Sequence, residues 1–74
     1  MVKHLQDALM RKHEVLRRTG LSNSSLYLLM ADGRFPRPVR LGPRTVRWVE
    51  REVQNFIEGC VAGRDKAQAG RDHE

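Results

Sequence analysis

Arginine is the residue whose type and spacing in this sequence most suggest a chemical role. Six arginines lie between Arg34 and Arg51 against one acidic residue, Glu50, so this segment carries the whole chain's net charge of +5. The segment contains no lysine. A guanidinium group offers paired donors that match phosphate oxygens and base edges. Basic runs also occur on ordinary solvated surfaces, but their concentration in one short segment favours a polyanion as partner.

Other reactive residues are too sparse or too scattered to form an active site or a metal centre. The lone cysteine, Cys60, cannot make a disulfide within the chain, and the three histidines lack the close spacing of a zinc site. Ser24 and Ser25 have no histidine and acid arrangement to activate them. We therefore expect no enzymatic activity, no metal and no cofactor. A free thiol fits a cytoplasmic location, and we expect no membrane partner because no apolar run could span a bilayer.

Two short helices are predicted before the arginine segment. The first is expected at Lys12–Thr19 and ends at Gly20, where a helix C-cap favours a positive φ. Ser22 is a good N-cap for the second helix, which Gly33 ends. The buried face of the second helix is predicted by i, i+3, i+4 spacing: Leu26, Leu29 and Met30. Two short helices joined by a glycine turn are typical of a helix-turn-helix, although such turns are common in helical proteins.

The arginine segment itself is predicted to form a β-hairpin. The prolines of Phe35-Pro36-Arg37-Pro38 exclude a helix there. Apolar residues then alternate with arginines on both sides of a turn at Gly42-Pro43-Arg44. This period of two predicts one face toward the core: Val39, Leu41, Val46 and Trp48. It places Arg40 and Arg47 in solvent. Because the hairpin follows a helix-turn-helix, it would serve as a wing.

A C-terminal amphipathic helix is predicted after the hairpin. Its apolar stripe has i, i+4, i+7, i+8, i+11, i+12 spacing: Val49, Val53, Phe56, Ile57, Cys60 and Val61. Core packing is the favoured interpretation of the stripe, and a partner groove is the alternative. The fold class predicted from these elements is α+β, mainly α, with two short N-terminal helices, a β-hairpin wing and a C-terminal helix.

The predicted domain covers residues 9–61. Residues 1–8 form an N-terminal extension, and Leu9 belongs either to a short helical face with Leu5 or to an extended stretch before the first helix. The tail, residues 62–74, is neutral and has no apolar residue larger than alanine, so we expect it to be disordered.

Several of these segments closely resemble the AlpA family of phage and prophage regulators. The matching residues are Thr19-Gly20-Leu21-Ser22, Tyr27, Gly33-Arg34-Phe35-Pro36, Pro38–Arg44, Trp48 and Glu52-Val53. The resemblance covers about Leu9 to Ile57. It implies a winged helix-turn-helix related to that of MerR proteins and excisionases. The implied function is DNA binding, as an activator of prophage genes or as an excision-directing factor.

The resemblance also implies roles for individual residues. Ser22 would cap the recognition helix, and Phe35 and Trp48 would be core. The groove-facing residues would be Asn23, Ser24, Ser25 and Tyr27. The wing contacts would be Arg40, Arg44 and Arg47. Ser22 and the neighbouring Arg34 and Arg37 complete the candidate DNA-binding residues.

This chain departs from the family pattern in its second helix. The family usually has arginine in place of Asn23 and a basic residue in place of Leu28, and no Lys or Arg occurs from Ser22 to Asp32. The wing and flanking segments must then supply the charge for phosphate contacts, while Asn23 can still read adenine. Tyr27 is expected either to bond a phosphate or to pack against the wing. Leu28 is either an isolated exposed leucine or a protein contact.

The residues leave two classes of function open. The first is sequence-specific binding of double-stranded DNA, with cooperative self-association at repeated sites and an integrase or another regulator as further candidate partners. The alternative is a protein-interaction module that binds a response regulator, a polymerase or an integrase. Salt dependence separates the two, because duplex binding weakens steeply with salt through counterion release.

Overall fold

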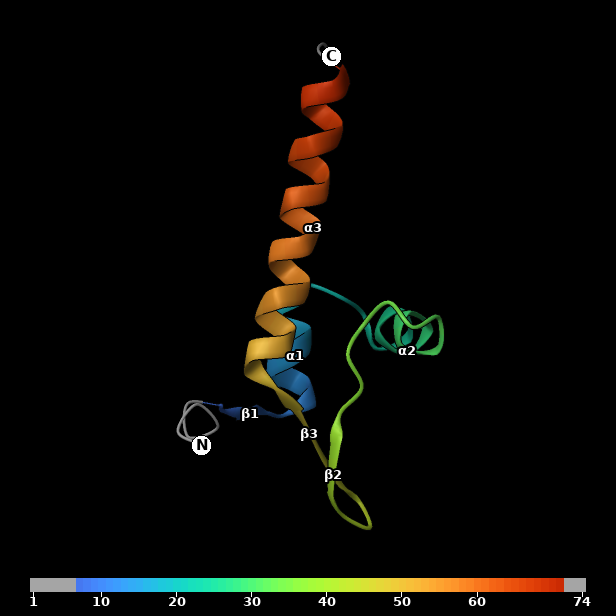
Figure 1. The fold of residues 1–74 in the computed structure, drawn as a ribbon. Coiled ribbons are helices and arrows are strands. Elements are labelled where there is room, and N and C mark those ends of the chain that lie inside the picture. Colours follow the sequence, from blue (N-terminus) through green and yellow to red (C-terminus); the bar gives the residue numbers. More distant parts are fainter. Residues whose placement is uncertain (1–6, 72–74) are drawn as a thin grey trace.

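The computed structural model describes residues 7–71, and its fold is the α+β, mainly helical, winged helix-turn-helix that the sequence predicts (Figure 1). The elements follow the chain in this order: β1 (Leu9–Met10), α1 (Lys12–Thr19), α2 (Asn23–Ala31), β2 (Val39–Gly42), β3 (Thr45–Val49) and α3 (Glu50–Arg71). Residues 1–6 of the predicted extension and residues 72–74 of the predicted tail lie outside the described residues. The domain limits stay a prediction.

Local backbone chemistry fixes the turn between α1 and α2 as expected. Gly20 adopts a φ of 75°, and its N–H donates to the Leu16 carbonyl oxygen at 2.7 Å. The Ser22 hydroxyl accepts a hydrogen bond from the Ser25 N–H at 3.1 Å and so caps α2. Both caps confirm the predicted helix ends, because each satisfies a backbone group that the helix leaves unpaired.

The sheet has three antiparallel strands in the order β1-β3-β2. Leu9 pairs with Val49 and Met10 pairs with Trp48, which resolves the open question about Leu9 in favour of an extended stretch. Immediately after β3 the chain enters α3, and the Glu50 N–H donates to the Ala8 carbonyl oxygen at 2.7 Å. The N-terminal segment therefore contacts both β3 of the wing and the start of α3.

The core lies where the helices meet the sheet. Its buried residues come from every element except β2: Met10, Val15, Leu26, Met30, Phe35, Trp48 and Val53. Phe35 packs edge-on against Phe56 at a centroid distance of 4.6 Å, and the Trp48 Nε1 donates to the Pro36 carbonyl oxygen at 3.2 Å. Phe35 and Trp48 are 3% and 1% exposed, which confirms their expected place in the core.

The wing differs from the sequence expectation in its register. Gly42 pairs with Thr45, but a bulge at Leu41 shifts the pairing, so Arg40 lies opposite Val46 and Val39 lies opposite Arg47. Directly paired residues share a face of the sheet, and a shift of one residue exchanges the faces.

The prediction that Val39 and Leu41 face the core is therefore wrong. The two side chains are 38% and 57% exposed, whereas Val46 and Trp48 pack inward as predicted. The alternation within each strand is real, but the two strands do not present their apolar residues to the same side.

The third helix differs from expectation at its far end. It continues to Arg71, so residues 62–71 are helical and not disordered. Val53 is buried and Phe56 and Ile57 pack on the core, but Cys60 is exposed and Val61 is 44% exposed, so the apolar stripe leaves the core before it ends. Residues 62–71 contain no proline and many good helix formers. The helix that starts with the packed first turns of α3 can therefore continue through them.

The far half of α3 projects away from the rest of the molecule (Figure 1). Every residue from Glu58 to Ala67 is exposed. No helix in the described part of the chain, the 22-residue α3 included, is both long and apolar enough to cross a membrane.

Candidate nucleic-acid interface

The outer face of α2 carries no charge. Leu26 and Met30 are buried and hold the helix on the core, with Leu29 packed partly against it. The exposed residues of α2 flank this buried side and cover the rest of the helix: Asn23, Ser24, Tyr27, Leu28 and Ala31. This face can offer amide and hydroxyl hydrogen-bonding groups together with apolar surface.

Ser22 and Ser25 lie at the N-terminus of α2 and bond to each other. Besides accepting from the Ser25 backbone, the Ser22 hydroxyl donates to the Ser25 hydroxyl at 3.0 Å. Ser25 is half-buried, whereas Asn23 and Ser24 are exposed. At the start of the helix, Ser22 and Ser25 therefore form a capping pair, and Asn23 and Ser24 form an outward pair.

Tyr27 contacts a lysine that the sequence reasoning did not select. The Lys12 Nζ lies 5.4 Å from the centre of the Tyr27 ring, within range of a cation–π interaction, and Tyr27 as a residue is 47% exposed. Lys12 opens α1, and its charge therefore lies beside a helix that has no basic residue of its own. The sequence signal that could have identified Lys12 is its position in α1, the helix that lies next to α2 in a helix-turn-helix.

One arginine of the basic segment has a structural role in the described part of the chain. Arg51 forms a bidentate pair with Asp7, with its Nε and Nη2 at 2.9 and 3.2 Å from the two carboxylate oxygens. The hydrogen bonds and charge of Asp7 raise the pKa of Arg51 above its usual value. Arg51 therefore ties the chain before β1 to α3.

Four arginines of the wing and of the segment leading into it have no acidic partner among the described residues. Those that form no ion pair with any described carboxylate are Arg37, Arg40, Arg44 and Arg47. Arg40 donates to the Pro43 carbonyl oxygen at 3.2 Å and Arg47 to that of Val46 at 2.8 Å, contacts that leave both charges uncompensated.

The shifted register spreads these charges over the wing. Arg40 lies on the face of Val46, Arg47 lies on the face of Val39, and Arg44 occupies the turn between the strands. The wing is thus basic on both faces and at its tip, where the sequence predicted a single arginine face.

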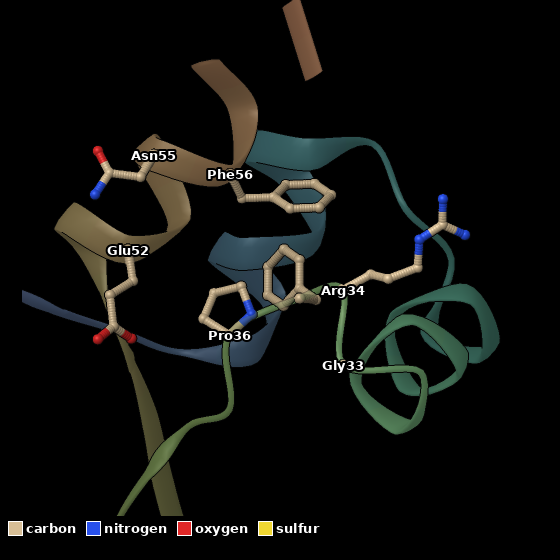
Figure 2. A pocket seen from close by; sticks show the side chains of 7 residues that line it. Gly33, Arg34, Pro36, Glu52, Asn55 and Phe56 are labelled. Atoms are coloured by element: carbon tan, nitrogen blue, oxygen red, sulfur yellow. The ribbon is translucent and has the colours of Figure 1, made fainter. Parts of the chain in front are cut away.

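Arg34 lies between α2 and the wing. Its guanidinium is 3.7 Å from the Asp32 carboxylate. Both side chains are largely exposed, so this ion pair contributes little to the stability of the fold. Figure 2 shows the Arg34 side chain extending away from Glu52 and Asn55, toward α2. Arg34 and Arg37 therefore extend the basic surface of the wing toward the uncharged α2.

An open pocket of about 380 Å³ lies between the Gly33–Pro36 segment and α3 (Figure 2). Its polar lining from α3 consists of Glu52 and Asn55, beside the ring of Phe56. The lining contains no serine, cysteine or histidine. Within the described residues, no three histidine, cysteine or acidic side chains are grouped as metal ligands would be.

Comparison with known proteins gives one family and one phage relative. The family model described as "Prophage CP4-57 regulatory protein (AlpA)" matches residues 8–61, which contain both helices of the helix-turn-helix, the wing and the packed part of α3. "Uncharacterized protein ORF88" of Enterobacteria phage P4 is 39% identical over 61 residues, which are 82% of this chain and 69% of the phage protein. No solved structure matches the chain significantly.

Proposed function

Because the chain belongs to the AlpA family of prophage regulatory proteins, we propose that it binds double-stranded DNA sequence-specifically and acts in the cytoplasm as a prophage-type transcriptional regulator or excision-directing factor. The observation that carries this proposal is that a neutral, exposed helix face lies next to a wing whose arginines lack acidic partners among residues 7–71. The two surfaces suit the two kinds of DNA contact, since base edges specify and phosphates position.

In the proposed complex α2 lies in the major groove. A recognition helix presents its N-terminal residues to base edges, and the outward pair Asn23 and Ser24 occupies that position. Ser22 and Ser25 hold the first turn in shape. The exposed Tyr27 hydroxyl can reach a phosphate while Lys12 remains over its ring.

The wing and its approach supply the charge that α2 lacks. Arg34 and Arg37 follow α2, and the three wing arginines follow them along the chain. Each guanidinium that neutralises a phosphate releases bound counterions, so its contribution is independent of sequence and sensitive to salt. A wing that is basic on both faces can approach the backbone on either side of a groove.

A protein-interaction module remains the second candidate function, and one observation favours it. Leu28 is 71% exposed on the same face of α2, in a helix without charge. An integrase, a polymerase or a response regulator could bury such a side chain. A single exposed leucine is common on protein surfaces, however, and it does not explain the four arginines that form no ion pair within the described part of the chain.

The proposal is tested by selecting bound duplexes from a random pool with the full chain and measuring affinity over a range of salt concentrations. Enrichment of a defined site, with affinity that falls steeply with salt, supports sequence-specific duplex binding. If no sequence is enriched and no duplex is retained at low salt, the chain is not a DNA-binding protein and the interaction module replaces this function.

A further inference from the structure

We infer that α2 reads A·T base pairs in the major groove and that Leu28 determines specificity there by packing on a thymine methyl group. The inference rests on the proposed DNA binding and adds the chemistry of the site that is bound. It starts from the exposed side chains of α2 and from the base edges that each of them can recognise.

The exposed side chains of α2 form two rows along the helix. Residues one turn apart lie on the same side, so Asn23, Tyr27 and Ala31 form one row and Ser24 and Leu28 form the other. The buried residues Leu26 and Met30 lie next to the first row and on the opposite side of the helix from the second. Leu28 therefore belongs to the surface that a groove would meet, one turn along from Ser24.

The chemistry of these rows excludes the usual contacts to G·C pairs. Guanine is most often read by arginine or lysine, and the amino group of cytosine by a carboxylate. No residue from Asn23 to Ala31 carries either group. The same face offers an amide at Asn23, which pairs with the N6 and N7 atoms of adenine, and apolar groups at Leu28 and Ala31, which suit the C5 methyl of thymine.

The exposure of Leu28 distinguishes it from the other residues of α2. Its side chain is 71% exposed, compared with 0% for Leu26 and 8% for Met30. It contributes little to the core and has apolar area available for burial in a complex. The arginines after α2 supply the phosphate contacts, so an uncharged side chain at this position need not weaken docking.

Uracil substitution tests this inference because uracil lacks only the C5 methyl group of thymine. The full chain is titrated with its selected duplex and with duplexes in which each thymine in turn is replaced by uracil. Affinity should fall about fourfold at a thymine that contacts Leu28, as expected for one buried methyl group. Leu28→Ala should weaken binding to the thymine duplex by a similar factor and should make the protein insensitive to uracil at that position.

Leu41→Ala provides the matched control. Leu41 is also an exposed leucine, but it lies on the wing, so this variant should keep the wild-type response to uracil. Both side chains are exposed, so both variants should melt at the wild-type temperature.

Three results would overturn the inference while leaving DNA binding intact. They are a selected site that requires G·C pairs where α2 docks, a Leu28→Ala variant that still responds to uracil, and a Leu28→Ala variant that binds the selected duplex normally but loses a protein partner. Failure of the proposed function is distinct, because the wild-type chain would then select no duplex at all.

Discussion

Trp48 contacts several parts of this small domain. Its ring is 1% exposed in β3, in the same buried cluster as Val53 of α3, and its Nε1 donates to Pro36 in the segment that leads into the wing. The position therefore holds the wing, the approach segment and α3 together. Its neighbours explain why the tryptophan is structural and does not form a stacking platform for bases.

Truncation of this residue should unfold the domain. Trp48→Ala removes a large buried ring and should destabilise the fold by about 3–5 kcal/mol. Because the full stability of a small domain is of similar size, about 5 kcal/mol, the variant should be largely unfolded by circular dichroism. Trp48→Phe keeps most of the ring but loses the hydrogen bond to Pro36, so it should remain folded with a lower melting temperature. A folded Trp48→Ala protein with impaired binding would instead place Trp48 on the contact surface.

Residue-level expectations succeeded where a local physical rule acts alone. Gly20 and Ser22 were predicted as caps, and the structure shows the positive φ at Gly20 and the hydroxyl bond at Ser22. Lys12 was not selected, because its place beside Tyr27 depends on how α1 crosses α2. Arg51 belonged to the basic segment by sequence, but its pairing with Asp7 depends on contacts between distant parts of the chain.

At the scale of the elements, one bulge in the wing changes which side chains of a correctly predicted strand face the core. Alternation in each strand predicted the hairpin, but the relative register depends on the geometry of the turn. The unpaired Leu41 moves Arg40 to the face of Val46 and leaves Val39 opposite Arg47. Nothing in the alternation of residues distinguishes this pairing from the unbulged one.

The bulged register makes a testable difference between two apolar residues of the wing. Leu41→Ser should change the free energy of unfolding by no more than about 0.5 kcal/mol, because Leu41 is 57% exposed. Val46→Ser should cost about 1–2 kcal/mol, since Val46 packs against the core. Both variants place serine in the same hairpin, so denaturant melts compare burial directly. Equal losses would indicate the unbulged register, with Leu41 also facing the core.

The far half of α3 should be dispensable for folding. Residues Glu58 to Ala67 are exposed, so a chain that ends at Gly63 loses no described buried side chain. This chain should keep the melting temperature of the full protein and its affinity for DNA. A large loss of either in a thermal melt or a binding titration would show that the end of α3 docks on the domain or on the ligand.

The extent of α3 was underestimated from the sequence for a physical reason. The tail has no apolar residue that would require packing, and composition alone therefore predicted disorder. Its alanines and charged residues nevertheless have good helix propensity, and extending a formed helix avoids the cost of a new nucleus. The predicted core stripe correctly contained Val53 and Phe56 but continued to Cys60 and Val61, because periodicity does not show where a helix leaves its neighbours.

At the scale of the whole molecule, charge is separated from the helix that is proposed to read bases. The helix α2 has no charged residue, whereas Arg37, Arg40, Arg44 and Arg47 follow it without acidic partners among the described residues. In the proposed complex this separation assigns specificity to the helix and most of the electrostatic affinity to the wing. It also makes the two contributions separable by mutation, because the residues concerned lie on different elements.

The central claim is tested most directly by comparing Arg44→Ala with Asn23→Ala on a selected and a scrambled duplex at several salt concentrations. Arg44 lies exposed in the wing turn, so its loss should weaken both duplexes alike and reduce the salt slope of log affinity by about one unit. Asn23→Ala should weaken only the selected duplex, by about 1–3 kcal/mol, and leave the salt slope unchanged. If Arg44→Ala lost discrimination between the duplexes, the wing would be reading bases, and if neither variant changed binding to any duplex, the division between helix and wing would be contradicted.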